Sequence, residues 1–573
     1  MLEVGFTNST AVSSYELQDG NLITSTTNVR GAAIGSSPNL FTQSGGEHHA
    51  DTLYVAPRAQ YEFAGGILNV GQMTLNSQFA QTDGTHDVTL LRVHDGGHYI
   101  WTGGALNIAS GWELEGQGSP AAFTFPTTPS SLSINGIVSM GLRTVTNAGN
   151  VSVTLGPESL LIYDPGDDPA ADFASFTNQG MTHVRGTTLS IPAGKTVGGT
   201  GFLYDPVEVW GTIDPANGEQ IGLLNTVIVQ NGAYLESVSL SPRTTDSSVM
   251  YDGHIYGSSV NLGAYSASSF IQHDGLIEQS SVYVRGYRGA ESVYEMHGGT
   301  LSIPYLTIGS GPFDAGPSRF EQTGGDVLVA EDRSLALSVD SWVASAPASY
   351  VMSGGSLQAF NSLYVGMSSS GHGAFQVTNA SADITIGRSL VFGKASEFSA
   401  VDGTTIHLDE ARFDVYGTDC GKLAGLAHLT LIATGSPAEA KTFEVAGLDM
   451  GDVLAGFSDN FVLDVLQLGD LAGVGKLQLV DIDDNSLADA APEALYVNEL
   501  ILGAGSFLDL NGLNIYCRNF TNLGGTIDLS SGGGIYEVPE PVGLLLMVLF
   551  APVLLGRRAK WSMGMGAVGR RWR

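Results

Sequence analysis

The hexapeptide Phe320-Glu-Gln-Thr-Gly-Gly325 decides how this chain folds, because versions of it recur along most of the sequence. Each version places an aromatic residue five positions before a glycine. Regular copies begin at Tyr15, Phe41, Tyr61, Phe79, Tyr99, Phe270, Tyr294, Phe320 and Tyr350, and a degenerate copy begins at Phe375. Within each run of copies the closing glycine recurs every 18 to 30 residues. A period of this length, with short strands in each unit, is typical of a β-solenoid.

The residue types in the repeat fit stacked strands joined by tight turns. Side chains alternate along a strand, so the aromatic residue and the residue two positions later share one face. Stacking successive coils would place these residues in aromatic and Gln/Met ladders inside the solenoid, while Gly-Gly or Asp-Gly supplies the positive φ of the corner. We therefore predict an all-β fold, a parallel β-helix or β-solenoid rod. The second position of the frame holds Leu17, Gln43, Phe63, Gln81, Trp101, Gln272, Met296, Gln322 and Met352.

Changes in the pattern mark the domain boundaries. Residues 1–410 are assigned to the solenoid, with 106–249 as irregular coils. Longer apolar strands begin near residue 411, and we expect 411–531 to form a C-terminal β region that caps the open end of the stack. The glycines of 532–537 indicate a flexible linker. A string of small β-sandwiches would need longer units than these.

The charge of the chain excludes one class of partner. Its 573 residues carry a formal net charge of −33, and only 14% are charged. Phosphate binding needs a basic surface, so nucleic acid is not expected as a partner. An acidic surface keeps a secreted protein soluble and attracts divalent cations.

The two cysteines and the first residues bear on the compartment. Cys420 and Cys517 could form one disulfide in an oxidising compartment, although their spacing does not require it. Met1-Leu2-Glu3-Val4 is neither basic nor followed by an apolar stretch, as a secretory signal would be. We expect the true start and the export signal to lie upstream.

Two acidic groups are candidate Ca²⁺ ligands. Closely spaced oxygen ligands on a loop can bind Ca²⁺, but neither group fits the EF-hand or the Gly-rich nonapeptide pattern. Solvated acidic loops are the favoured interpretation, so no metal and no cofactor is assigned. The groups are Asp164, Asp167, Asp168 and Asp172, and then Asp481, Asp483, Asp484 and Asn485.

No catalytic residue is assigned. His48 and His49 point to opposite faces of a strand and cannot share a metal, and no His-Glu-x-x-His frame includes His94 or His98. Gly-x-Ser-x-Gly and phosphate-loop motifs are absent from the sequence. Arg285 and Arg288, near Asp274 and Glu291 in the sequence, are the group that a β-helix polysaccharide-degrading enzyme would need in one groove.

The last residues form a tripartite tail. Val538-Pro539-Glu540-Pro541 is followed by an uncharged apolar run, 542–555, and then by Arg557 and Arg558. A helix of that run would span about 21 Å, which is less than a hydrocarbon core of about 30 Å. Such a helix suits transient anchoring in the membrane, with the arginines on the cytoplasmic side.

This tail, residues 538–573, resembles the PEP-CTERM sorting signal, and the segment 505–516 is similar to the end region of planctomycete-type PEP-CTERM proteins. The resemblance implies export to the surface or matrix of a Gram-negative-type bacterium, with an exosortase and the membrane as partners through residues 538–558. The repeats are similar to those of autotransporter passengers.

Two functions follow as hypotheses. The first is a secreted, surface-sorted protein with a structural or adhesive role and extracellular polysaccharide as a candidate ligand. The second is a β-helix polysaccharide lyase or glycoside hydrolase. An enzyme of that kind requires a groove with two carboxylates within about 10 Å, or a Ca²⁺ site beside an arginine or lysine.

Overall fold

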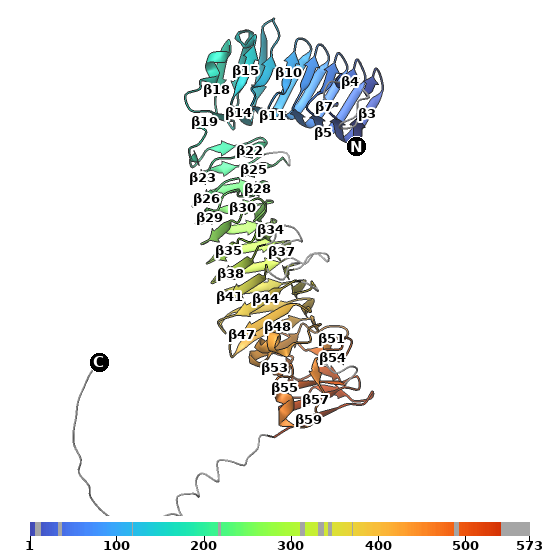
Figure 1. Ribbon diagram of the computed structural model, residues 1–573. Coiled ribbons are helices and arrows are strands. Elements are labelled where there is room, and N and C mark those ends of the chain that lie inside the picture. The colour runs from blue at the N-terminus through green and yellow to red at the C-terminus, as the bar shows by residue number, and fades with distance from the viewer. Residues whose placement is uncertain are drawn as a thin grey trace, which may run out of the picture.

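The computed structural model describes residues 1–5, 13–32, 37–116, 118–215, 219–309, 316–329, 337–341, 346–368, 371–485 and 492–539. These residues form an all-β parallel β-solenoid of about 22 turns, which confirms the predicted fold class. Figure 1 shows two stacks of coils, one from β1 to β19 and one from β20 to β59, with the first lying across the end of the second. This corner corrects the prediction of one continuous rod.

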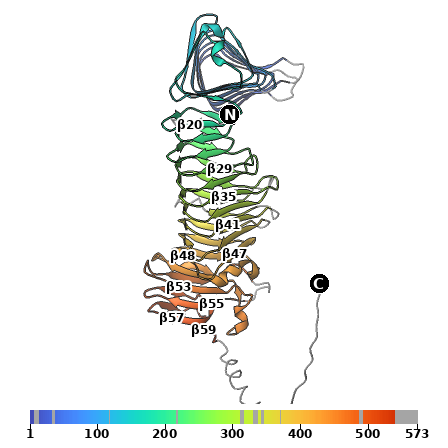
Figure 2. The same ribbon diagram turned by 90° about the vertical axis from the view of Figure 1, so that its left-hand side faces the viewer.

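The first stack has a triangular cross-section, seen end-on in Figure 2. Its longest sheet, here called the bent sheet, has the order β1 (Leu2–Val4), β3 (Asn21–Val29), β5 (Glu47–Val55), β7 (Ile67–Leu75), β9 (Thr85–Val93), β11 (Ala105–Leu114), β14 (Ile137–Met140), β17 (Leu160–Tyr163) and β19 (Met181–Val184). Its aromatic sheet has the order β15 (Arg143–Thr146), β12 (Ala121–Thr124), β10 (His98–Trp101), β8 (Gln78–Gln81), β6 (Ala59–Phe63), β4 (Asn39–Gln43) and β2 (Ser14–Leu17). A short sheet joins β13 (Ser130–Ile134), β16 (Val151–Leu155) and β18 (Ser175–Asn178).

The second stack begins with an aromatic sheet and adds two others, here called the middle and return sheets. The aromatic sheet contains β20 (Leu189–Ile191), β23 (Val207–Val209), β26 (Val227–Val229), β29 (Ser247–Met250), β32 (Ser269–Gln272), β35 (Ser292–Met296), β38 (Ser318–Gln322), β41 (Ala348–Met352), β44 (Gly373–Val377) and β47 (Ser396–Ala400). The return sheet contains β22 (Gly201–Leu203), β25 (Ile221–Leu223), β28 (Val238–Leu240), β31 (Ser259–Leu262), β34 (Ser281–Val284), β37 (Tyr305–Ile308), β40 (Leu337–Val339), β43 (Ser362–Val365), β46 (Ser389–Phe392), β49 (Arg412–Val415), β51 (Lys441–Glu444), β54 (Lys476–Val480), β56 (Phe507–Asp509) and β58 (Thr526–Asp528).

The middle sheet runs the whole length of the second stack. It contains β21 (Thr196–Val197), β24 (Thr212–Ile213), β27 (Tyr234–Glu236), β30 (His254–Tyr256), β33 (Leu276–Glu278), β36 (Thr300–Ile303), β39 (Asp326–Val329), β42 (Ser356–Ala359), β45 (Asp383–Ile386), β48 (Thr404–Asp409), β50 (Leu429–Thr434), β53 (Leu463–Leu468), β55 (Glu493–Leu502), β57 (Asn514–Asn522) and β59 (Gly534–Glu537), and β52 (Gly447–Leu448) pairs with β55. The described 3-10 segments are η1 (Ala148–Asn150), η2 (Pro169–Asp172), η3 (Cys420–His428) and η4 (Leu454–Phe457).

Each coil of the first stack up to β10 and β11 is made of two strands, because its second strand bends, whereas the later coils use a strand of the short sheet instead of the bend. In β7, Leu68 and Val70 point inward before the bend, and Met73 and Leu75 point inward after it. The two halves therefore supply two sides of the triangle. The second stack breaks each bent strand into two, so each of its regular coils has three strands.

The repeat hexapeptide supplies the core, as predicted. Its aromatic residues are buried and stack from coil to coil, with Phe41 and Tyr61 rings 4.4 Å apart and Tyr294 and Phe320 rings 4.8 Å apart. The closing glycine needs its residue type: Gly299 has φ +74°, and a Cβ there would lie 2.4 Å from the Gly275 carbonyl oxygen.

The solenoid continues through the segment expected to cap it. The middle and return sheets run on through 411–531, whereas the aromatic sheet ends at β47 and η3 packs beside that strand. Residues 534–537, inside the segment expected as a linker, form β59 and pair with β57. Val538 is buried against Tyr516 and Tyr496, and its N–H bonds to the Cys517 carbonyl at 2.8 Å.

The outer face of the bent sheet joins the two stacks. The Thr200 N–H bonds to the Ser110 carbonyl at 3.0 Å, and the Arg92 guanidinium lies 4.6 Å from the centre of the Phe202 ring. Burial at this joint raises the pKa of Glu113 to about 7, although Arg92 opposes the shift. The corner is therefore a packed contact and not a loose linker.

Candidate functional site

A groove runs along the outside of the bend in the bent sheet. It crosses β3, β5, β7, β9 and β11 and has a volume of about 460 Å³. In Figure 1 these strands lie on the side of the first stack that faces the second stack. Ala109, at one end of the groove, directly precedes Ser110, whose carbonyl accepts the Thr200 N–H, so this end lies close to the joint between the stacks. The lining residues are Ile23, Thr24, His49, Ala50, Asp51, Asn69, Val70, Gly71, Asp87, Val88, Thr89, Asn107 and Ala109.

One row of the groove is a ladder with one side chain per coil. The strand register aligns Ile23, His49, Asn69, Asp87 and Asn107. Asn69 and His49 side chains hydrogen-bond at 3.1 Å, and Asn107 donates to Asp87 at 2.6 Å. These bonds orient the row, whose spacing follows that of strands in a sheet, about 4.8 Å.

The groove has an apolar floor and polar walls. Ala50, Val70 and Val88 are buried beneath it, whereas Asp51 and Asp87 line its two sides. No lysine or arginine is among its lining residues. The bend also needs Gly71, because a Cβ there would lie 2.6 Å from the Asp51 carbonyl oxygen. This arrangement suits hydrogen bonding to an extended, hydroxyl-rich chain and not to a polyanion.

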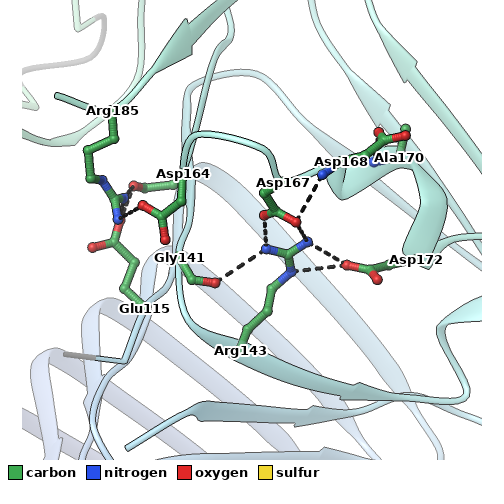
Figure 3. A network of polar contacts seen from close by, with 10 residues as sticks. Glu115, Gly141, Arg143, Asp164, Asp167, Asp168, Ala170, Asp172 and Arg185 are labelled. Atoms are coloured by element: carbon green, nitrogen blue, oxygen red, sulfur yellow. Dashed lines mark hydrogen bonds and ion pairs between the residues drawn. The ribbon is translucent and has the colours of Figure 1, made fainter. Parts of the chain in front are cut away.

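Three members of the first predicted acidic group, Asp164, Asp167 and Asp172, form ion pairs with arginine (Figure 3). The fourth, Asp168, is exposed and accepts the Ala170 N–H. Arg143 lies between Asp167 and Asp172 and donates to Asp172 at 2.6 and 3.0 Å. Burial opposes the charge, but the bonds to Asp167 and Asp172 raise the pKa of Arg143. Arg185 binds Asp164 at 3.0 Å and also contacts Glu115.

The second predicted acidic group folds around a buried glutamate. Glu444 Oε1 accepts the N–H groups of Ile482 and Asp483 at 2.8 and 2.9 Å. Asn485 is buried and donates to the carbonyls of Val415 and Gly417. Across the described ranges, no three His, Cys, Asp or Glu side chains are grouped to hold a metal ion.

The histidines have separate structural roles. His48 is buried and His49 is partly exposed, as the strand alternation predicts. Burial, with a smaller contribution from His49, lowers the pKa of His48 to about 4. His94 lies 3.9 Å from Glu113, whereas His98 bonds to Thr124 at 2.8 Å.

The group expected for a polysaccharide-degrading enzyme does not assemble through the contacts of the described residues. Arg285 lies over Tyr283 and Arg288 over Tyr287. Glu291 pairs with Arg319 at 3.2 Å, and Asp274 accepts the N–H of Gly275.

Both cysteines are free thiols, so the disulfide is not formed. Burial raises the pKa of the Cys517 thiol to about 11, with a smaller contribution from Glu537. Its Sγ lies 3.7 Å from the Tyr536 carbonyl oxygen and donates to it.

The predicted sorting residues are only partly described. Val538 and Pro539 follow β59, whereas Glu540, Pro541, the apolar run 542–555, Arg557 and Arg558 lie outside the described residues. Among the helices of the described segments, none is long and apolar enough to cross a membrane.

Apart from His49, which is considered only as a metal ligand, the groove residues are absent from the sequence-based candidates, yet the repeat contains a signal for them. Each member of the ladder stands three positions after the glycine that closes a hexapeptide, as Asn69 follows Gly66 and Asp87 follows Gly84. The same offset places Ile23, His49 and Asn107 after Gly20, Gly46 and Gly104. A search for regularly spaced polar residues on the outward face would have found the row.

Comparison with known proteins finds no matching family model, no matching curated protein and no matching solved structure. No activity is therefore transferred to this chain from a relative.

Proposed function

We propose that the chain is an exported, surface-sorted protein of the extracellular matrix, with a structural and adhesive role, and that it binds polysaccharide along the groove of its first stack. The solenoid supplies a long scaffold, because stacked coils can continue over more residues than a single globular core can accommodate.

The polar ladder carries the proposal. The ladder presents one hydrogen-bonding side chain per coil above a shallow apolar floor, and these side chains are His49, Asn69, Asp87 and Asn107. A polysaccharide is a repeating chain of hydroxyl groups and apolar ring faces, so a repeating protein surface can bind several sugars in the same way. The bonds within the ladder hold the side chains in place before the ligand arrives, which lowers the entropy cost of binding.

The sorting part of the proposal is supported by the position of the tail. The last described strand ends at Glu537, and the Pro-Glu-Pro motif begins two residues later. The motif therefore follows directly on the folded body. The two prolines of the motif, Pro539 and Pro541, favour an extended backbone that a processing enzyme can bind.

The test mixes the full chain with a neutral β-glucan, dextran and polygalacturonate, with and without Ca²⁺, and measures polymer length and co-elution by size-exclusion chromatography with light scattering. The proposal expects co-elution with a neutral polymer at unchanged length. Shortening of the polymer would instead identify a polysaccharide-degrading enzyme, and the absence of co-elution with both neutral polymers would reject the groove as a glycan site.

Two variants sharpen this test. The groove variant Asn69→Ala/Asp87→Ala/Asn107→Ala removes three members of the ladder and should lose at least tenfold in affinity. The control Gln60→Ala/Glu62→Ala removes two polar residues from the outer face of β6, where Gln60 donates to Glu62 at 2.9 Å. That control should bind as the wild type does.

A further inference from the structure

One corner of the second stack gathers arginine and tyrosine side chains. The corner lies where return-sheet strands lead into aromatic-sheet strands, and its loops follow β22, β28, β31 and β34. Four of the six cation–π contacts in the described chain fall here, so the grouping is not an even scatter over the surface. We name the strip by its members: Arg243, Tyr265, Tyr283, Arg285, Tyr287 and Arg288.

Each arginine of the strip is held against an aromatic ring. Arg243 lies 4.3 Å from the centre of the Tyr265 ring and 5.9 Å from that of Tyr204. Arg285 and Arg288 lie 4.6 Å and 5.1 Å from the ring centres of Tyr283 and Tyr287. A guanidinium stacked on a ring keeps its N–H fork free at the edge, which suits a planar anion.

The loops that carry the strip are packed on one another. Ser266 Oγ donates to the carbonyls of Pro242 and Thr244 at 3.3 and 3.1 Å, which joins the loop of Tyr265 to that of Arg243. A Cβ on Gly263 would overlap the Arg285 carbonyl oxygen, so these two loops are also in contact. The strip is therefore continuous along the stack.

The tip of the last loop displays its arginine. Tyr287 and Ala290 exchange two backbone hydrogen bonds of 3.0 and 2.9 Å around Arg288 and Gly289. Arg288 has φ +48° and Gly289 has φ +81°, the positive values of a tight two-residue turn. A residue other than glycine is strained in this conformation, so the fold holds Arg288 outward at an energetic cost.

The three arginines lack an ion-pair partner among the described residues, although the chain carries 57 acidic residues against 24 basic ones. Two acids of the same corner are already engaged, Glu291 with Arg319 and Asp205 with His183. Asp246, on the same loop as Arg243, makes no ion pair with it. Positive charge is therefore left available at this corner of an acidic molecule.

We propose that the arginine–tyrosine strip is a second binding surface, for a polysaccharide that carries carboxylate or sulfate groups. The guanidinium forks would bind the acidic groups, and Tyr265, half exposed at 51%, would stack on the apolar face of a sugar ring. This surface uses none of the groove residues and does not depend on the function proposed for the groove.

Charge density favours an acidic polysaccharide over a nucleic acid. The loops of Arg243 and Arg285 are two coils apart, which is about 10 Å at the usual strand spacing. Duplex DNA carries one charge per about 1.7 Å of its axis, and a molecule with a net charge of −33 repels so dense a polyanion. Acidic groups spaced along a sugar chain match the strip better.

The experiment measures binding of the full chain to polygalacturonate, chondroitin sulfate, dextran and a short DNA duplex by biolayer interferometry at two salt concentrations. Wild type should bind polygalacturonate, chondroitin sulfate or both, more weakly at high salt, and should bind the DNA duplex at least tenfold more weakly. Equal affinity for the DNA duplex would overturn the assignment to acidic sugars.

The variant Arg243→Gln/Arg285→Gln/Arg288→Gln should lose at least tenfold in affinity for the acidic polymer, and unchanged affinity would overturn the proposal. Arg58→Gln, an exposed residue of the first stack, controls for loss of charge elsewhere and should have little effect. The variant Arg243→Lys/Arg285→Lys/Arg288→Lys keeps the positive charge but loses the guanidinium groups that stack on the tyrosine rings. It should bind several-fold more weakly, and wild-type affinity would overturn the role given to the guanidinium groups.

The groove variant separates this inference from the proposed function. It should keep its affinity for the acidic polymer, and the triple glutamine variant should keep its affinity for the neutral one. If the groove variant abolished binding of both the neutral and the acidic polymer, the strip would not be a separate surface.

Discussion

The Tyr61 hydroxyl donates a hydrogen bond to Gln43 Oε1, 2.9 Å away in the preceding coil. The same bond recurs wherever the repeat places tyrosine after a Phe-x-Gln coil. Regular copies with phenylalanine carry glutamine two positions later, and copies with tyrosine carry an apolar residue there, whereas the degenerate copy at Phe375 carries Val377. Each buried phenol therefore has its acceptor one coil earlier. The other pairs are Tyr99–Gln81 at 2.7 Å, Tyr294–Gln272 at 2.7 Å and Tyr350–Gln322 at 2.6 Å.

Removing one hydroxyl should destabilise the stack. Tyr294→Phe leaves the buried Oε1 of Gln272 without its donor, which costs about 1–3 kcal/mol in the free energy of unfolding. Gln272→Met adds a cost of its own, because the Gln272 amide also donates to the carbonyls of Gly275 and Thr300. The loss in the double variant Tyr294→Phe/Gln272→Met should still be smaller than the sum of the two single losses, because both substitutions remove the same hydrogen bond. Urea unfolding followed by circular dichroism measures the effect. Tyr251→Phe, half exposed, is the control and should change stability by less than about 0.5 kcal/mol. Additive losses would contradict the pairing.

Acid should destabilise the first stack through its buried histidines. Burial lowers the pKa of His86 to about 3, against about 6.5 in an unfolded chain. The unfolded chain therefore binds protons at a higher pH than the folded one, and stability falls as the pH drops from about 7 towards 3.

His86→Asn tests this dependence, because its amide can keep a donor near the Tyr99 hydroxyl, 2.7 Å from His86 Nδ1. The loss of unfolding free energy between pH 7 and pH 4 should be smaller in the variant than in the wild type. His273→Asn, at an exposed position of the second stack, should leave that loss unchanged. An equal loss in His86→Asn would show that another group controls the acid response.

The glycine that closes each repeat turn should be required because a Cβ has no space there, and not only because its φ is positive. Gly299→Ala meets both a positive φ and a backbone oxygen, and we expect a cost above about 2 kcal/mol. Gly232 has φ +78° but no atom within 4 Å of a Cβ, so Gly232→Ala should cost about 1 kcal/mol. Thermal unfolding of both variants gives the comparison. Equal costs would argue against the backbone contact.

Glu444 should make the stability of the second stack fall as the pH rises from about 4.5 to about 7. Burial, together with Asp483 and Asp481, raises its pKa to about 7 despite two backbone hydrogen bonds. The folded state thus holds a proton that the unfolded state releases above pH 4.5, and stability decreases as the pH rises through 7. Glu444→Gln keeps an oxygen acceptor for Ile482 and Asp483 and should be more stable than wild type at pH 8, with little difference at pH 4.5. Glu62→Gln is the surface control. Lower stability of Glu444→Gln at pH 8 would refute this account.

The tail should control release from the cell. Replacing Pro539, Glu540 and Pro541 by alanine should leave the precursor in the membrane fraction of a host that has an exosortase. Immunoblots of membrane, surface and medium fractions measure the distribution. Ser530→Ala/Ser531→Ala, just upstream, should be released normally. Normal release of the triple variant would remove the sorting proposal.

The repeated part of the fold is predictable because its determinants are local. An aromatic residue, a residue two positions later and a glycine after them define a strand and a turn within six residues, as at Phe320–Gly325. The alternation of Phe-x-Gln and Tyr-x-apolar copies is equally visible in the sequence. The hydrogen bond that it creates can be recognised only once it is known which coil precedes each tyrosine in the stack.

The joint between the two stacks and the proposed binding surfaces are harder to predict from the sequence than the repeat is. Arg92 and Phe202 meet across about a hundred residues of chain, and neither belongs to the hexapeptide. Outward positions such as Asn69 and Arg243 carry no apolar pattern, because solvent accepts many residue types there. Asp167 and Asp172 are conspicuous in the sequence, yet their partner Arg143 lies more than twenty residues away.

The pairing of tyrosine with the glutamine below it has a consequence for how such a chain can change its length in evolution. Duplication or deletion of a single coil would set two phenols or two amides next to each other and leave one without its partner. Gain or loss of two coils keeps every pair intact. The heritable module is then the coil pair, which measures 38 residues from Phe41 to Phe79 and 50 from Phe270 to Phe320. Length variants that survive selection should differ by whole pairs.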